Sequence, residues 1–217
     1  MIKAFIFDLD GVITDTSEFH YLAWKRLADE EEIPFSRQKN EELRGVSRRD
    51  SLLLLLAGRQ VSEGTLQLWM TRKNNYYLDL VRQITPKDVL PGVKMFLDEA
   101  RGMGICCAIA SSSKNANLVV RNLQIGNYFS VIVDGNAVEH SKPHPVLFLT
   151  AAEKLCVNPH ECIVFEDAAS GIEAAIAARM ISIGIGPRER LSRANQVYPD
   201  FTGITPGFIL SSINQAL

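Results

Sequence analysis

IKAFIFDLDGVITD, residues 2–15, is a short apolar run followed at once by two aspartates and a glycine. A continuous apolar run of this length is typical of a strand buried on both faces of a parallel sheet. Ligands of such sheets bind outside the carboxyl ends of the strands. Asp8 and Asp10 come directly after the run, so the sequence predicts a polar site at that edge.

Four further apolar runs are interpreted as strands: Ile105–Ala110, Val131–Val133, Ile163–Phe165 and Ile181–Ile185. Helical patterns follow most of them, over Val93–Met103, Asn115–Leu123, Pro145–Leu155 and Ser170–Arg179. Alternating strands and helices favour an open α/β sheet. We therefore expect a Rossmann-like, parallel-sheet core made of residues 1–15 and 88–217.

Residues 16–87 contain helical patterns with no strand between them. The first helix is predicted over Thr16–Glu31, and later helices begin after the potential N-caps Ser36, Ser47 and Ser62. The helix after Ser36 is expected to end at Gly45. This segment is interpreted as an α-helical cap domain inserted after the first strand of the core.

The composition excludes two classes of protein. Lys and Arg number 23 and Asp and Glu 25, so the net charge of −2 provides no basic field for nucleic acid. The longest aliphatic run, Leu52–Ala57, is far shorter than the roughly 20 apolar residues of a membrane span. Asp8 and Asp10 interrupt the region where a signal peptide is hydrophobic. We expect a cytoplasmic protein with no membrane or nucleic-acid partner.

The cysteines indicate a reducing compartment. The four of them form no Cys-x-x-Cys pair and no zinc-ligand spacing. Cys106 and Cys107 lie inside an apolar run and are expected to be buried free thiols.

Polar residues also follow the other predicted strands: Ser111, Ser112, Ser113, Lys114 and Asn115, then Lys142, then Glu166 and Asp167. Four carboxylates at one rim would repel one another without a cation, and hard oxygen ligands suit Mg²⁺. One carboxylate can attack phosphorus, and a second, two residues on, can act as general acid and base. Lysine and hydroxyls can orient phosphoryl oxygens. The set predicts Mg²⁺-dependent phosphoryl transfer.

Asp8–Asp15, Ser111–Asn115, Lys142-Pro143 and Glu166-Asp167 resemble, in order and spacing, the four motifs of haloacid dehalogenase-superfamily phosphotransferases. The resemblance implies that Asp8 is the nucleophile that becomes phosphorylated and that Asp10 is the general acid and base. It also implies a Mg²⁺ site formed by Asp8, Asp10, Glu166 and Asp167. Ser111 and Lys142 would hold the transferring phosphoryl group, which the Leu9 and Asp10 backbones bracket.

Thr16, His20, Trp24, Gly45–Arg48, Asp50-Ser51 and Arg72–Asn74 resemble the cap of the sugar-phosphate mutases in this superfamily. The resemblance implies that Arg48, with Ser113, Lys114 and Asn115, holds the phosphate that is not being transferred. His20, Trp24 and Lys73 would position sugar and cap. The remaining implied substrate-binding residues are Arg44, Gly45, Val46, Ser47, Ser51 and Ser112, with Arg44 standing where the family pattern has lysine.

The reaction implied by this resemblance interconverts β-D-glucose 1-phosphate and D-glucose 6-phosphate. β-D-Glucose 1,6-bisphosphate would be the intermediate and activator, the partners would be small sugar phosphates, and the protein would be a monomer. Two alternatives stay open. A sugar-phosphate phosphatase would share this core but bring water to phospho-Asp8, and a regulatory protein would bind sugar phosphates without turnover.

Overall fold

Six parallel strands form one sheet, in the order β3-β2-β1-β4-β5-β6, in the computed structural model, which describes residues 1–214. The strands are β1 (Ala4–Phe7), β2 (Cys106–Ala110), β3 (Val131–Val133), β4 (Cys162–Glu166), β5 (Ile181–Ile185) and β6 (Gln196–Tyr198). β1 lies in the middle, and the strand order reverses direction there, between β1 and β4. In open α/β sheets, ligands bind at such a reversal. The predicted α/β fold with a parallel sheet is confirmed.

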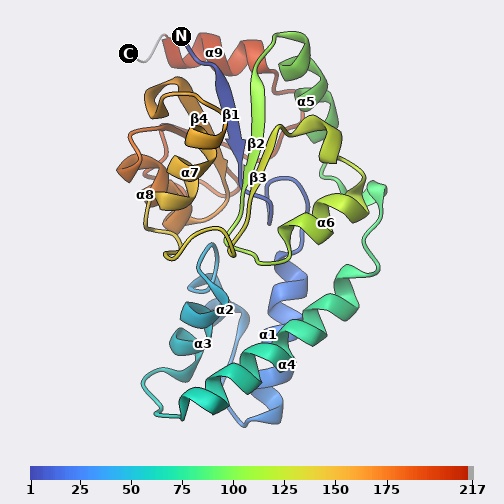
Figure 1. The fold of residues 1–217 in the computed structure, drawn as a ribbon, viewed down its shortest axis with the longest axis vertical. Coiled ribbons are helices and arrows are strands. Elements are labelled where there is room, and N and C mark those ends of the chain that lie inside the picture. Colours follow the sequence, from blue (N-terminus) through green and yellow to red (C-terminus); the bar gives the residue numbers. More distant parts are fainter. Residues whose placement is uncertain (215–217) are drawn as a thin grey trace.

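Helices cover both faces of the sheet (Figure 1). One layer consists of α5 (Val93–Gly102), α6 (Ala116–Leu123) and α9 (Pro206–Asn214), and the other of α7 (Val146–Lys154) and α8 (Ala169–Ala177). Alternate residues of β1 point to the two layers. Phe5 and Phe7 pack with α5 and α9, whereas Ala4 and Ile6 pack with α7 and α8. This burial on both faces explains why the strand sequence is continuously apolar.

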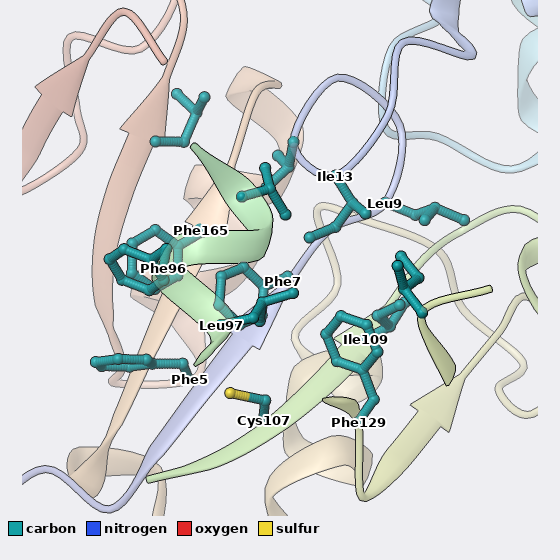
Figure 2. Close-up of a cluster of buried hydrophobic side chains, with 14 of the residues drawn as sticks. Phe5, Phe7, Leu9, Ile13, Phe96, Leu97, Cys107, Ile109, Phe129 and Phe165 are labelled. Carbon is teal, nitrogen blue, oxygen red and sulfur yellow. The ribbon is translucent and has the colours of Figure 1, made fainter. Parts of the chain in front are cut away.

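Aromatic rings dominate the first of these layers (Figure 2). Phe7 and Phe165, from adjacent strands, stack with ring centroids 4.8 Å apart, and Phe96 of α5 meets Phe165 edge-on at 5.3 Å. Such aromatic pairs add about 0.5–1.5 kcal/mol beyond the burial of their area. They join β1, β4 and α5, and acidic residues lie at the carboxyl ends of these two strands.

The inserted segment folds into α1 (Ser17–Glu30), α2 (Arg37–Glu41), α3 (Arg48–Leu56) and α4 (Glu63–Val81). Its own apolar cluster includes Trp24, Leu27, Leu52 and Trp69. The three predicted N-caps are confirmed, because Ser36, Ser47 and Ser62 each accept a hydrogen bond from the backbone N–H three residues later. Figure 1 shows this cap below the carboxyl ends of the strands.

The structure corrects two of the sequence predictions. The helix after Ser36 ends at Glu41 instead of Gly45, because the chain turns there toward the core and reaches Gly45 with a φ of +74°. Cys106 is exposed, since it is the first residue of β2, whereas Cys107 is buried as expected. All four cysteines are free thiols.

Two elements, β6 and α9, were not predicted from the sequence. Short 3₁₀ turns lie at Pro86–Asp88, Gly126–Tyr128 and Pro159–Glu161. No helix within residues 1–214 is long and apolar enough to cross a membrane.

Candidate active site

A cavity lies between cap and core at the carboxyl ends of β1 and β4. Its walls bring together most of the residues that the sequence singled out: Asp8, Asp10, His20, Trp24, Arg44, Gly45, Val46, Arg48, Ser51, Lys73, Ser112, Ser113, Lys114 and Asp167. Ser17, Asn40 and Leu43 complete the lining and were not predicted. Leu9, Ser111, Lys142 and Glu166 are buried behind this wall.

Lys142 is a buried cation between two acids of the core. Its Nζ contacts Asp8 Oδ1, lies 2.6 Å from Glu166 Oε1 and donates to the Ala110 carbonyl at 3.2 Å. Burial alone would lower the pKa of Lys142, but Asp8 and Glu166 raise it above its ordinary value. The ammonium therefore stays charged next to Asp8, where it can neutralise phosphoryl oxygens.

Asp8 is fixed from two sides. One carboxylate oxygen contacts Lys142, and the other accepts a hydrogen bond from the Asp10 backbone N–H at 2.9 Å. Its own backbone N–H donates to the Phe165 carbonyl of the adjacent strand at 2.9 Å. The carboxylate is thus held at the cavity wall in one orientation, as a nucleophile must be.

Asp10 has the surroundings of a group that exchanges protons near neutral pH. Burial and the neighbouring Asp8 charge raise the pKa of Asp10 to about 7. The Thr16 hydroxyl donates to its Oδ1, and His20 Nε2 lies 3.8 Å from its Oδ2. A carboxyl with a pKa near the working pH is suited to general acid–base catalysis.

His20 and Lys73 form the cap side of this environment. Lys73 Nζ lies 2.8 Å from His20 Nδ1 and 4.8 Å from the centre of the Trp24 ring. Burial lowers the pKa of both groups well below their ordinary values, and Arg48 lowers them further. Lys73 and His20 are thus joined by a hydrogen bond beside Asp10.

Asp167 is the second acid after β4 and contacts cations from both domains. Arg44 Nη1 of the cap lies 2.7 Å from its Oδ2, and Arg190 Nε of the core donates to its backbone carbonyl at 2.8 Å. Burial, followed by the charges of Glu166 and Asp8, raises the pKa of Asp167 well above its ordinary value. Gly11 makes room for it, since a Cβ there would lie 2.4 Å from Asp167 Oδ2.

These acids have the chemistry of a magnesium site. Asp8, Asp10 and Asp167 offer oxygen atoms to one cavity, and their crowding is unfavourable without a further cation. Within residues 1–214, however, no three His, Cys, Asp or Glu side chains already converge closely enough to bind a metal. Glu166 has both oxygens engaged, one by Lys142 and one by the Ala168 N–H at 2.7 Å. In this arrangement it orients Lys142.

Arg48 is a basic residue of the cap that lines the cavity and has no carboxylate partner among the described residues. Among the described residues it forms no ion pair, whereas Arg44 pairs with Asp167 and Arg49 with Glu63. Burial lowers the pKa of Arg48. A half-buried guanidinium without an anion beside it, facing a cavity, is suited to bind a phosphate.

Direct hydrogen bonds join cap and core around the cavity. Ser112 Oγ donates to the Gly45 carbonyl at 2.7 Å, and Asn115 Nδ2 donates to Asn74 Oδ1 at 2.9 Å. The Ser170 hydroxyl donates to the Arg44 carbonyl at 3.0 Å. Ser47 serves here as the N-cap of α3. The structure thus shows the cap closed on the core.

The sequence reasoning assigned no role to Thr16, Asn74 or Arg190. Thr16 lies in one of the segments that resemble the superfamily, and its contact with Asp10 could have been inferred from that. Asn74 also lies in such a segment, but no local pattern indicates its contact with Asn115, 41 positions away, or that of Arg190 with Asp167, 23 positions away.

Known proteins share both the sequence and the shape of this chain. Residues 2–179 match a family model described as haloacid dehalogenase-like hydrolase. A β-phosphoglucomutase from Bacillus subtilis is 42% identical over 94% of this chain and 92% of its own. A phosphorylated carbohydrates phosphatase from Thermotoga maritima is 30% identical over 82% of each chain. The crystal structure of a β-phosphoglucomutase from Clostridium difficile superposes with a TM-score of 0.96 at 40% identity, covering 100% of this chain and 99% of the other.

Proposed function

Because the chain belongs to the haloacid dehalogenase-like hydrolase family, we propose that it is an enzyme that interconverts β-D-glucose 1-phosphate and D-glucose 6-phosphate. The reaction passes through an aspartyl phosphate on Asp8 and through β-D-glucose 1,6-bisphosphate. The observation that carries this proposal is one cavity lined by residues of both domains. The core contributes Asp8, which contacts Lys142, and the cap contributes Arg48, which forms no ion pair within the described residues.

Asp8 and Asp10 carry the covalent steps. A carboxylate oxygen of Asp8 attacks the phosphoryl group of the bisphosphate, and the bond between phosphorus and the sugar oxygen breaks. Asp10, protonated near neutral pH, gives its proton to that departing oxygen. In the second half, Asp10 takes the proton from the hydroxyl of the incoming sugar phosphate, which attacks phospho-Asp8 and restores the free carboxylate.

The charge of the transferring group is balanced by the surrounding residues. Lys142, held between Asp8 and Glu166, lies where it can neutralise phosphoryl oxygens, and Ser111 is buried at the end of β2. Asp8, the Asp10 backbone and Asp167, with Glu166 behind them, would hold Mg²⁺. A bound Mg²⁺ would supply further positive charge to the phosphoryl oxygens.

The cap holds the second phosphate and excludes water. Arg48, Ser113 and Lys114 line the same cavity as Asp8, and Asn115 of the core donates to Asn74 of the cap. A mutase must hold either phosphate of the bisphosphate there while the other faces Asp8. A closed cap also keeps water from phospho-Asp8, as transfer to a sugar hydroxyl requires.

Phosphorus NMR tests the proposal. The protein is supplied with β-D-glucose 1-phosphate, Mg²⁺ and a trace of β-D-glucose 1,6-bisphosphate, and the products are followed over time. The proposal expects glucose 6-phosphate as the main product, with inorganic phosphate forming slowly. If inorganic phosphate forms at the rate at which substrate disappears, the chain is a sugar-phosphate phosphatase. Unchanged substrate would identify a binding protein.

We propose further that a single chain acts in the cytoplasm, since cap and core of one chain together line the cavity. The four free thiols are consistent with a reducing compartment.

A further inference from the structure

Arg190 lies in the loop between β5 and β6, outside the set of residues given a role in the proposed reaction, and bridges two parts of the site. Its Nε donates to the Asp167 carbonyl at 2.8 Å, and its Nη1 lies 2.8 Å from Glu41 Oε2 of the cap. Its Nη2 is 3.9 Å from Asp167 Oδ2. One planar guanidinium thus contacts the backbone of a candidate metal ligand and a carboxylate of the other domain, which suits the fork geometry of arginine.

Glu41 extends this bridge back to Asp167. It is the last residue of α2, and both of its oxygens accept from Arg44 Nε, at 3.2 and 3.1 Å. Arg44 in turn lies 2.7 Å from Asp167. Burial alone would raise the pKa of Glu41, but Arg44 and Arg190 lower it below its ordinary value. The four side chains form a closed ring of alternating charge, with Arg190 and Asp167 from the core and Glu41 and Arg44 from the cap.

The position of this ring gives it a role beyond that of a surface ion pair. An isolated exposed pair contributes only about 0.2–1 kcal/mol. Here Glu41 directly precedes the loop 42–47 and Arg44 belongs to it. The Gly45 carbonyl of this loop accepts from Ser112, and the loop leads directly into Arg48. The ring therefore fixes the start of the segment that carries the cap's phosphate-facing arginine.

We propose that Arg190 is a positioning residue, which docks the cap through Glu41 and thereby sets the loop that leads to Arg48. Arg190 does not line the cavity, and it contacts the site through Glu41 of the cap and Asp167 of the core. The docking claim stands on the geometry alone, and only its kinetic consequence rests on the proposed function.

Hydrogen exchange in the complete protein tests the docking directly. The amides of Glu42, Leu43 and Arg44 donate to backbone carbonyls and are protected while the loop is docked. In Arg190→Ala, exchange of residues 42–47 is expected to rise about fivefold, in the range of a coupled ion-pair network. Arg193→Ala is the matched control, because Arg193 pairs with Glu173 at 2.8 Å entirely within the core. Protection of residues 42–47 that is equal in the two variants would overturn the proposal.

A double-mutant cycle separates docking from general loss of structure. Glu41→Gln should raise amide exchange in residues 42–47. Adding Arg190→Ala to Glu41→Gln should change this exchange little further, because each substitution breaks the same contact between Glu41 and Arg190. Fully additive effects would show that the two residues act separately and would overturn the bridge. Arg190→Lys keeps the charge but cannot make both contacts with a fork, so protection should be only partly restored. If the amides of residues 42–47 are no better protected in Arg190→Lys than in Arg190→Ala, a role for the positive charge of Arg190 is contradicted.

Steady-state kinetics gives the consequence for substrate. Arg190→Ala should raise the KM for β-D-glucose 1-phosphate about fivefold, a larger change than in kcat, since the contacts of Asp8 with Lys142 and with the Asp10 N–H are untouched. Arg193→Ala, the control, should leave both KM and kcat unchanged. A change in Arg190→Ala that is confined to a fall in kcat would contradict the positioning role. If the wild-type protein does not isomerise the sugar phosphate, the proposed function fails, while the exchange experiment still decides the docking.

Discussion

Asp8 and Asp10 are two residues apart in the same loop, yet their surroundings prepare them for different tasks. Asp8 contacts the buried ammonium of Lys142, which stabilises a carboxylate that can act as nucleophile. Asp10 contacts only the Thr16 hydroxyl directly, and its pKa is raised to about 7. Environments that separate two carboxyl groups in this way assign one as nucleophile and the other as acid and base.

Asp8→Asn should abolish the phosphoenzyme while leaving the fold intact. The amide is a poor nucleophile, but it has nearly the same shape and can still accept from the Asp10 N–H. Intact-protein mass spectrometry after incubation with β-D-glucose 1,6-bisphosphate measures the phosphoryl adduct, and circular dichroism checks the fold. An adduct on the variant, or isomerase activity within about tenfold of wild type, would contradict the assigned nucleophile.

Asp10→Asn should stabilise the metal-free protein at high pH. The pKa of Asp10 rises from 3.8 to about 7 on folding, so the folded state binds its proton more tightly than the unfolded chain does. Stability is therefore lost as pH rises from about 4 to about 7, and asparagine escapes this loss. With chelator present, urea unfolding should show the variant more stable by about 1 kcal/mol or more at pH 8, and no more stable at pH 4. An equal difference at both pH values would contradict the assigned cause.

At the scale of the elements, the first turn of α8 controls the acids after β4. Gly171 lies there against Glu166, and an added Cβ would come within 1.8 Å of Glu166 Oε1. Since that oxygen bonds Lys142, the close approach of helix and strand is what keeps the Lys142 ammonium next to Asp8.

Gly171→Ala should therefore destabilise the protein by about 1–3 kcal/mol, the usual cost of overpacking. Gly64→Ala in α4 is the control, because the nearest atom to its added Cβ is 3.8 Å away. Alanine at position 64 should leave the free energy of unfolding unchanged or raise it by up to about 1 kcal/mol. Urea unfolding of both variants measures the difference, and equal stabilities would contradict the packing argument.

The elements also show how far the sequence alone could predict this fold. β1, β2, β4 and β5 are continuously apolar because they are buried, and they were found for that reason. β6 has three half-buried residues at the sheet edge, QVY, which carry no such signal. α9 begins with Pro206-Gly207, a pair typical of turns.

The candidate site, too, could be predicted from the sequence only in part. The acids, serines and Lys142 were predicted because parallel strands bring their carboxyl ends to one edge. The contact between Glu41 and Arg190 could not be predicted from the sequence, since the two residues are 149 positions apart and meet only once the cap docks. Arg44 was expected at the substrate, and the structure shows its guanidinium on Asp167 and Glu41.

At the scale of the whole molecule, the two domains divide the work. In the proposed reaction the core supplies the nucleophile and the acidic residues, whereas the cap supplies Arg48 and closes the cavity. Holding a second phosphate is what distinguishes a mutase from a phosphatase that uses the same core, so on this proposal the cap decides the reaction.

Arg48→Ala should separate the two reactions. A charge-assisted hydrogen bond contributes roughly 1.5–3 kcal/mol, so isomerisation should fall at least about tenfold. Hydrolysis of phospho-Asp8 needs no second phosphate and should change less than about threefold. Arg49→Ala is the control, because Arg49 is on the same helix but pairs with Glu63 and does not line this cavity. If the rates of isomerisation and of phospho-Asp8 hydrolysis fall by the same factor, or if neither falls, Arg48 does not bind the second phosphate.

The central claim is that the phosphoryl group passes through Asp8 and so leaves the sugar that brought it. A crossover experiment measures this most directly. ¹³C-labelled β-D-glucose 1-phosphate is mixed with unlabelled sugar whose phosphoryl group carries ¹⁸O, and the glucose 6-phosphate formed is analysed by mass spectrometry. Transfer through phospho-Asp8 predicts product that combines ¹³C sugar with the ¹⁸O phosphoryl group from the first turnovers, and none with Asp8→Asn. Product in which every sugar keeps its own phosphoryl group would contradict the account.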